Sequence, residues 1–161
     1  MKTVNDIHKG RMVVAVDDSP GSIAALEWAS KHAHRFNMYI EAITAWDYHY
    51  EVGETMAAGM GGQTYIPGID PKSIAEKQLA HAVNKVFEDA RPFDLITKVE
   101  NGDPVSVLVE ESKGAELVVV GSRGHGPLLD LFLGSVSDKT AVKAHCPVVI
   151  VHQQDGNHNH E

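Results

Sequence analysis

The sequence contains one cysteine, Cys146, so no disulfide can form within the chain. Long apolar runs are also missing: stretches such as 117–120 and 147–151 are far shorter than the roughly 20 residues that a membrane-spanning helix needs. The first ten residues lack the apolar core of a signal peptide. Together these absences predict a soluble protein in the reducing environment of the cytoplasm.

Positive charge is scarce as well. The chain has 14 Lys and Arg against 22 Asp and Glu, a formal net charge of −8, and no segment forms a basic stripe. Nucleic acids and anionic membrane surfaces are bound through clustered cations, so neither is expected as a partner. At 161 residues the chain suits one domain with one hydrophobic core, and we therefore look for one site.

Two common nucleotide-binding fingerprints do not occur. The GxxxxGK[ST] loop of P-loop NTPases is absent, and the stretch GSRGHGPLL does not match the GxGxxG dinucleotide pattern. The glycine cluster at 59–62 fits neither pattern. These two classes of nucleotide-binding protein are therefore excluded.

Five runs of apolar, mostly β-branched residues predict five strands. Most runs are continuous rather than alternating, which is typical of strands covered by helices on both faces of a parallel sheet. The predicted strands are 12–16, 39–45, 95–99, 117–120 and 148–151.

Helix start signals lie between these runs. Each of the first three is a capping residue followed by proline, namely Ser19–Pro20, Asp70–Pro71 and Asp103–Pro104. Apolar residues at helical spacing extend the first helix to Phe36 and the second to Ala90, and Gly114 predicts the end of the third. A fourth helix is expected over 135–144. The pattern predicts an α/β fold, an open parallel sheet with helices on both faces and right-handed crossovers.

The predicted domain covers 11–152, between an N-terminal tail at 1–10 and a disordered polar tail at 153–161. Segment 47–69 fits neither period and is rich in glycine, so it is either a flexible flap over the site or an insertion. His158, His160 and Glu161 in the C-terminal tail could bind a metal, but a solvated polar terminus is the favoured interpretation and no metal site is predicted.

The stretch 118–142 has the residue types of a phosphate-binding turn. Gly121 ends a predicted buried strand, Gly124 follows after two residues, and nine residues later Gly134 and Ser135 open the last helix. Glycine lets backbone N–H groups approach a phosphate closely, and a helix N-terminus attracts its charge. Isolated glycines at strand ends also serve turns, however, and a serine at a helix start also serves as a cap.

Polar side chains in the same stretch could also bind the phosphate. The hydroxyls of Ser122, Ser135 and Ser137 can donate to phosphate oxygens, while Arg123 or His125 would add positive charge. In a parallel sheet, ligands gather outside the carboxyl ends of the strands, where this turn is expected. The sequence therefore predicts a phosphate site there.

The spacing of these glycines resembles the G-2x-G-9x-G[ST] nucleotide motif of the ATP-binding universal stress proteins. VVAVDDS at 13–19 resembles the first strand of that family, whose terminal acidic residue falls on Asp17. ITAW at 43–46 is similar to the end of its second strand, and NGDP at 101–104 to the turn before its third helix. The resemblance extends from Gly10 to His152 and implies an adenine nucleotide alpha-hydrolase-like sheet with strand order 3-2-1-4-5.

The resemblance also implies a ligand, ATP with or without Mg²⁺, with adenine beside the first two strands and phosphates on the glycine turn. Asp17 would contact the adenosine moiety; the alternative is that Asp17, Asp18 and Ser19 only cap the first helix. Together with Ser122 and Arg123, the expected nucleotide-binding residues are Ala15, Val16, Asp17, Ala45, Val120, Gly121, Gly124, Gly134, Ser135, Val136 and Ser137.

A phosphate-binding turn is not by itself a catalyst. Hydrolysis needs a base or water-orienting group and usually a metal held by carboxylates, and the spacing of Asp17, Asp18 and Asp130 does not demand a metal site. No catalytic residue is assigned. The sequence favours a stress-response or signalling nucleotide-binding module over a slow adenine-nucleotide hydrolase or nucleotidyl transferase, and over a structural dimer without ligand.

The last predicted strand lies at a sheet edge in the implied order. It is almost entirely apolar from Pro147 to Val151, and no charge or bulge protects it before His152. Such edges pair readily with another chain. We therefore expect a homodimer through 147–152, unless the polar tail folds back over the edge.

Overall fold

The computed structural model describes residues 9–47, 68, 70–90, 92, 94–123 and 133–153. Gly124, His125, Asp130, most of both predicted tails and nearly all of segment 47–69 lie outside the described residues. Gly10, which was assigned to the N-terminal tail, is instead the first residue of β1. The elements in chain order are β1 (Gly10–Ala15), α1 (Pro20–His32), β2 (Met38–Trp46), α2 (Pro71–Phe87), β3 (Leu95–Asn101), α3 (Pro104–Glu111), β4 (Leu117–Gly121), α4 (Ser135–Lys143) and β5 (Val148–Val151).

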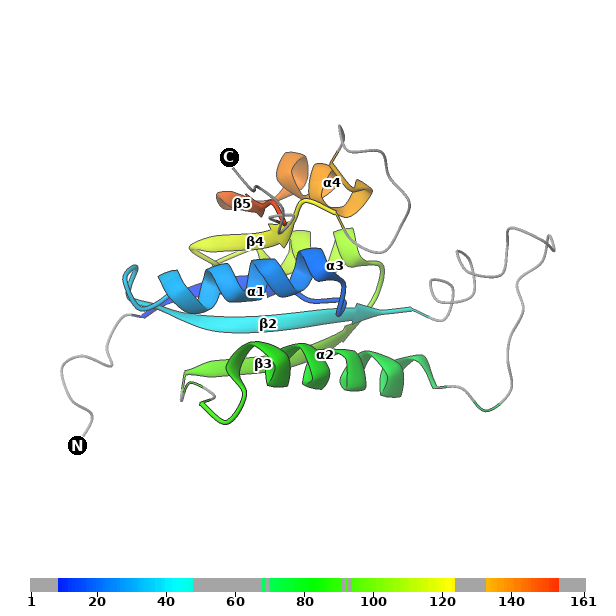
Figure 1. The fold of residues 1–161 in the computed structure, drawn as a ribbon. Helices are drawn as coiled ribbons and strands as arrows, with labels where there is room; N and C mark the ends of the chain where they lie inside the picture. The colour runs from blue at the N-terminus through cyan, green and yellow to red at the C-terminus, as the bar shows by residue number, and fades with distance from the viewer. Residues whose placement is uncertain are drawn as a thin grey trace, which may run out of the picture.

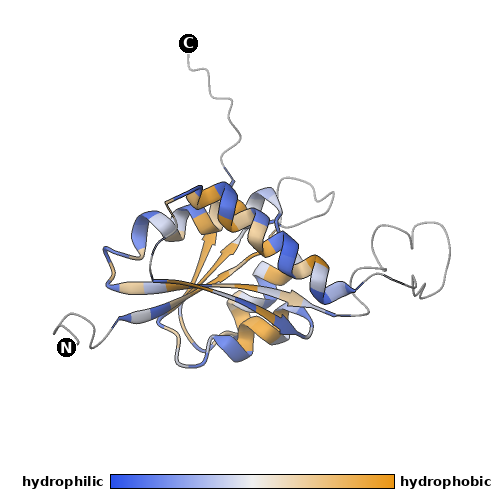
Figure 2. Cartoon of the chain, turned by 90° about the horizontal axis from the view of Figure 1, so that it is seen from below, coloured by the Kyte–Doolittle hydropathy of each residue, from blue (hydrophilic) through white to orange (hydrophobic). Residues whose placement is uncertain are grey.

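The five strands form one parallel sheet in the order β3-β2-β1-β4-β5 (Figure 1). This confirms the predicted fold class and strand order. Helices α1 and α2 cover one face and α3 and α4 the other, and their apolar residues turn toward the sheet (Figure 2).

Strand β1 shows why the apolar runs are continuous. Met12 and Val14 pack into the core beneath α1 and α2, whereas Val13, between them, packs with Leu108 of α3 on the opposite face. Because successive side chains of a strand point to opposite faces, a strand with two covered faces needs apolar residues at every position.

The predicted caps are confirmed. Ser19, Asp70 and Asp103 are the N-caps of α1, α2 and α3, each side chain accepts a hydrogen bond from a backbone N–H in the first turn, and each is followed by proline. Because a capping side chain and a first-turn proline act locally, these starts could be located from the sequence alone.

Two helices end earlier than the apolar spacing predicts. Helix α1 ends at His32, because the chain reverses at Asn37 with φ 53° so that Met38 N–H donates to Ala33 O. Phe36 therefore lies outside the helix and is 50% exposed. Helix α2 ends at Phe87 and is followed by Glu88 with a positive φ of 47°, so Ala90 is not helical either.

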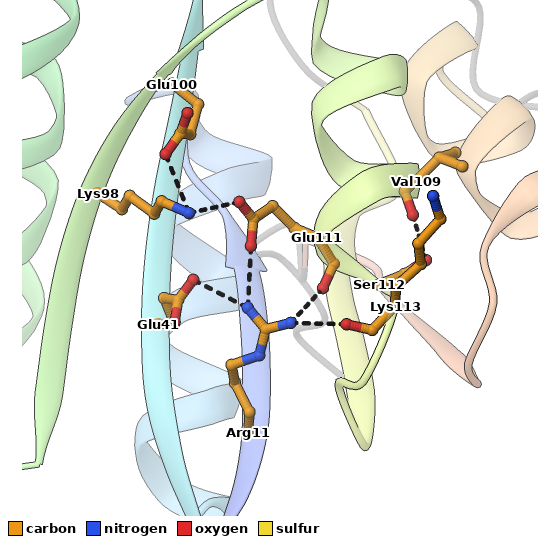
Figure 3. A network of polar contacts seen from close by, with 8 residues as sticks. All are labelled: Arg11, Glu41, Lys98, Glu100, Val109, Glu111, Ser112 and Lys113. Carbon is orange, nitrogen blue, oxygen red and sulfur yellow. Dashed lines mark hydrogen bonds and ion pairs between the residues drawn. The ribbon is translucent and has the colours of Figure 1, made fainter.

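A network of ion pairs connects strands β1, β2 and β3 with helix α3 (Figure 3). Arg11 of β1 donates to the carboxylates of Glu41 in β2 at 3.2 Å and Glu111 in α3 at 2.9 Å. It also donates to the main-chain oxygens of Glu111 and Lys113, and so caps the carboxyl end of α3. Lys98 of β3 bridges Glu111 and Glu100.

Candidate functional site

The predicted site residues that the structure describes lie where the carboxyl ends of β1, β2 and β4 meet the N-termini of α1 and α4. At the end of β1, Val16 is held by β2 from both sides: its N–H donates to Ile43 O at 2.8 Å, and its carbonyl accepts from Thr44 Oγ1 at 2.8 Å. Thr44 is only 2% exposed. Thr44 was not predicted from the sequence, where its only signal is a hydroxyl in a strand whose one charged residue is Glu41.

Asp17 stabilises the turn that leads into α1 through hydrogen bonds. Its Oδ1 accepts from the backbone N–H of Ser19 at 3.0 Å and from the Ser19 hydroxyl, while its own N–H donates to Ser22 Oγ at 3.2 Å. Ser19 is the N-cap proper, because its hydroxyl accepts from Ser22 N–H. Ser19 therefore caps the first helix, as the alternative interpretation of this turn expects, and Asp17 supports the cap by accepting hydrogen bonds from Ser19.

Gly121 is explained by packing before any ligand is considered. A Cβ on Gly121 would lie 2.5 Å from the carbonyl carbon and oxygen of Gly21, in the first turn of α1. A Cβ on Gly21 would in turn collide with the carbonyl oxygen of Arg123. The two glycines let β4 and α1 approach closely, which brings the β1–α1 turn against the β4 end. Gly21 was not singled out from the sequence.

The two halves of the glycine motif are joined directly. Gly134 N–H donates to Ser122 O at 2.7 Å, and the Ser137 hydroxyl donates to Gly121 O. Ser122 N–H donates to Val151 O at 2.8 Å, which fixes the turn to β5. The first turn of α4 therefore sits against the end of β4, although the Ser137 hydroxyl is already engaged within the protein.

The N-terminus of α4 differs from those of the other helices. Its N-cap is Gly134, which has no side chain to accept from the first backbone N–H groups, whereas α1, α2 and α3 are capped by side chains. Ser135 at the first position is exposed. A helix N-terminus of this kind carries partial positive charge and backbone donors that suit a phosphate.

The remaining predicted residues that the structure describes are buried or half-buried. Val16 and Val120 are 3% and 2% exposed and belong to the core, so only their main-chain atoms could meet a ligand. Ala15 and Ala45 pack beside the core beneath α3, and Val136 is partly buried against the same core. Gly124 falls outside the described residues.

At the carboxyl end of β3, the N-cap carboxylate of α3, that of Asp103, has a lowered pKa. The hydrogen bond from Ser106 to Asp103 lowers the pKa of that carboxyl, with a smaller contribution from the Val105 N–H. The positive charge of Lys139 in α4 also lowers the pKa of Asp103. Helices α3 and α4 are thus linked electrostatically near the carboxyl ends of the strands.

Other features bear on ligands of different kinds. Among the described residues, no group of three or more His, Cys, Asp or Glu could hold a metal ion. Hollows of about 180 and 240 Å³ flank β3, one against α3 and one against α2, and neither is lined by a predicted site residue. None of the helices in the described ranges is both long and apolar enough to cross a membrane.

A five-stranded parallel sheet with a glycine-rich turn at the carboxyl end of β4 defines an α/β protein of the doubly wound kind. The model of the universal stress protein family matches residues 9–152. The chain belongs to the universal stress protein family, and the resemblance seen in the sequence is confirmed.

Individual relatives agree. A universal stress protein of Mycobacterium tuberculosis is 34% identical over 146 residues, covering 88% of this chain and 45% of the relative, so the chain spans less than half of that relative's length. A solved universal stress protein in complex with cAMP is 27% identical, with a TM-score of 0.63 over 91% of this chain and 98% of that one. The structure of the Archaeoglobus fulgidus protein in complex with dAMP shares the fold, with 19% identity and a TM-score of 0.56 over 89% of this chain and 98% of that one.

Proposed function

We propose that this chain binds an adenine nucleotide, ATP in preference to others, at the carboxyl ends of β1 and β4, and acts in the cytoplasm as a stress-response or signalling module. The observation that carries the proposal is the hydrogen bond from Gly134 to Ser122. It sets a helix N-terminus without a side-chain cap beside the end of β4. Backbone donors and the helix dipole there suit a phosphate chain.

The family relationship supports an adenine nucleotide in particular. The solved relative that is 27% identical was crystallised with cAMP, which shares adenosine and a phosphate with ATP. The preference for ATP rests on the G-2x-G-9x-G[ST] spacing from Gly121 to Ser135. In this proposal Asp17 contacts the adenosine moiety, Ala15 and Ala45 flank it, and the first turn of α4 receives the phosphates.

Calorimetric titration of the full chain tests the proposal. ATP is expected to bind with one site per chain and GTP clearly more weakly, and titrations with and without Mg²⁺ define whether the metal accompanies the nucleotide. Retention of ATP without steady release of ADP supports a binding module. Heat signals no different from buffer for ATP, ADP and cAMP alike would refute nucleotide binding.

We also propose that the chain forms a homodimer through β5. This strand lies at the sheet edge, and β4 is its only strand partner among the described residues. All four of its residues are only partly buried, and Val142 of the neighbouring α4 is 78% exposed. An apolar edge with open backbone groups is stabilised by pairing with a second copy.

A further inference from the structure

The turn after β1 contains a strained residue. Asp18 has φ 61°, in the left-handed region that residues with a side chain avoid, although aspartate tolerates it better than most. Such backbone conformations persist where the surroundings hold them and are concentrated at functional sites. Asp18 directly follows Asp17, so a change of the backbone at Asp18 would also move Asp17 and disturb its hydrogen bonds with Ser19.

The carboxylate of Asp18 is held by a residue from another element. His81 of α2 places its Nδ1 2.8 Å from Oδ1 and 2.9 Å from Oδ2 of Asp18. With its proton on Nδ1, the ring donates to both carboxylate oxygens. The His81 side chain is 66% exposed and that of Asp18 25%. The turn is thus held by Ser19 and Ser22 of its own helix and by α2 from outside.

This contact is not what docks α2 on the sheet. The helix buries an apolar stripe that includes Ala75, Leu79, Ala82 and Val83, and burial of such side chains dominates helix docking. A hydrogen-bonded pair as exposed as this one adds little to the global stability of the fold, because water screens it. The contact therefore bears on the local conformation of the β1–α1 turn more than on the docking of α2.

We propose that His81 is a positioning residue for the nucleotide: by holding Asp18 it keeps the β1–α1 turn in the conformation that presents Asp17 to adenosine. This inference rests on the proposed function. It assigns to α2 a part in setting nucleotide affinity. Loss of the contact lets the strained turn relax and lowers affinity for the whole adenosine series.

Calorimetry with ATP on the full chain tests this. His81→Ala is expected to weaken ATP by about fivefold or more, the lower end of coupling between sites. His81→Asn, which keeps a donor near the position of Nδ1, is expected to restore most of the affinity. Asn84→Ala, on the same helix at another exposed position, is the matched control and should bind as the unaltered protein does. Melting temperatures of all three should stay close together.

A double variant shows whether His81 acts through Asp18. In an Asp18→Gly background, where glycine adopts the turn without strain, His81→Ala should have no further effect on ATP. An equal loss in both backgrounds would overturn the route through Asp18. Unchanged ATP binding by His81→Ala would overturn the positioning role and leave the proposed function intact. Absence of nucleotide binding in the unaltered chain would instead refute the proposed function, and the inference with it.

Discussion

Gly21 and Gly121 touch backbone to backbone, so that a Cβ on Gly121 would stand 2.5 Å from the Gly21 carbonyl. This contact joins the first turn of α1 to the last residue of β4 and brings the β1–α1 turn beside the glycine turn. Gly121 belongs to the glycine pattern that is typical of a nucleotide site. It is also needed for the packing of β4 against α1, whether or not a ligand binds.

Replacing either glycine by alanine should destabilise the fold. The added methyl group meets backbone atoms that cannot move independently, and overpacking of this kind costs about 1–3 kcal/mol. Urea unfolding of Gly21→Ala and Gly121→Ala measures the loss. Gly10→Ala is the control, because its Cβ meets mainly the side chain of Glu116, which is exposed and can move aside. Equal stability of Gly121→Ala and Gly10→Ala would contradict the packing role.

Replacing threonine by valine should affect the free energy of unfolding differently at the two buried residues Thr44 and Thr140. Thr44→Val removes the hydroxyl that donates to Val16 O and should cost about 1 kcal/mol. Thr140 Oγ1, by contrast, has no hydrogen-bond partner among the described residues although the residue is fully buried. Thr140→Val should therefore be neutral or stabilising by up to about 1 kcal/mol. Denaturant unfolding measures both, and a clear loss in Thr140→Val would reveal a partner for that hydroxyl.

The free energy of unfolding should decrease at acid pH, in part because Glu111 becomes protonated. Burial opposes ionisation of this carboxyl, but hydrogen bonds from Lys98 and Arg11 outweigh it and lower its pKa below the ordinary value of 4.5. A carboxyl with a lowered pKa stabilises the folded state above its unfolded pKa, and this contribution is lost as the pH falls through the folded pKa. Glu111→Gln should therefore lower stability at neutral pH and flatten its dependence on acid.

Denaturant unfolding at a series of pH values from neutral to acid measures this effect. Glu110→Gln is the matched control, since Glu110 is exposed and pairs only with Lys113 among the described residues. An acid dependence as steep in Glu111→Gln as in Glu110→Gln would show that other carboxyls dominate.

The two edges of the sheet provide a paired test of the dimer. Val149→Lys in β5 should shift the protein toward monomer in light scattering, because a charge at the paired edge opposes association. Ile96→Lys makes a similar change in β3, the opposite edge, where Ile96 is already 48% exposed. It should leave the mass unchanged. A native mass of 17.5 kDa at high micromolar concentration would exclude the dimer.

Local signals and the family resemblance predicted most of the fold. The helix starts at Ser19, Asp70 and Asp103 depend on residues next to each other in sequence, and the strand order followed from the resemblance. Apolar spacing could not locate the end of α1. Phe36 keeps the helical period, but the reversal at Asn37 is set by the docking of β2 against β1.

The sequence supplied candidate site residues, but not the contacts that they make with one another. Gly121, Gly134 and Asp17 were identified from spacing and resemblance. The contacts of Gly21 with Gly121 and of His81 with Asp18 join residues far apart in the chain. Only the folded topology brings such residues together, and no local pattern marks them.

The central claim is that phosphate is received at the N-terminus of α4, and a pair of variants at Gly134 tests it most directly. Gly134 has φ −62°, which any residue can adopt, and aspartate and asparagine are both favoured N-caps. The two side chains have nearly the same shape and differ in charge. Calorimetric titration with ATP should therefore show much weaker binding to Gly134→Asp than to Gly134→Asn, with both variants folded. Equal ATP affinity of the two variants would contradict a phosphate site at this helix.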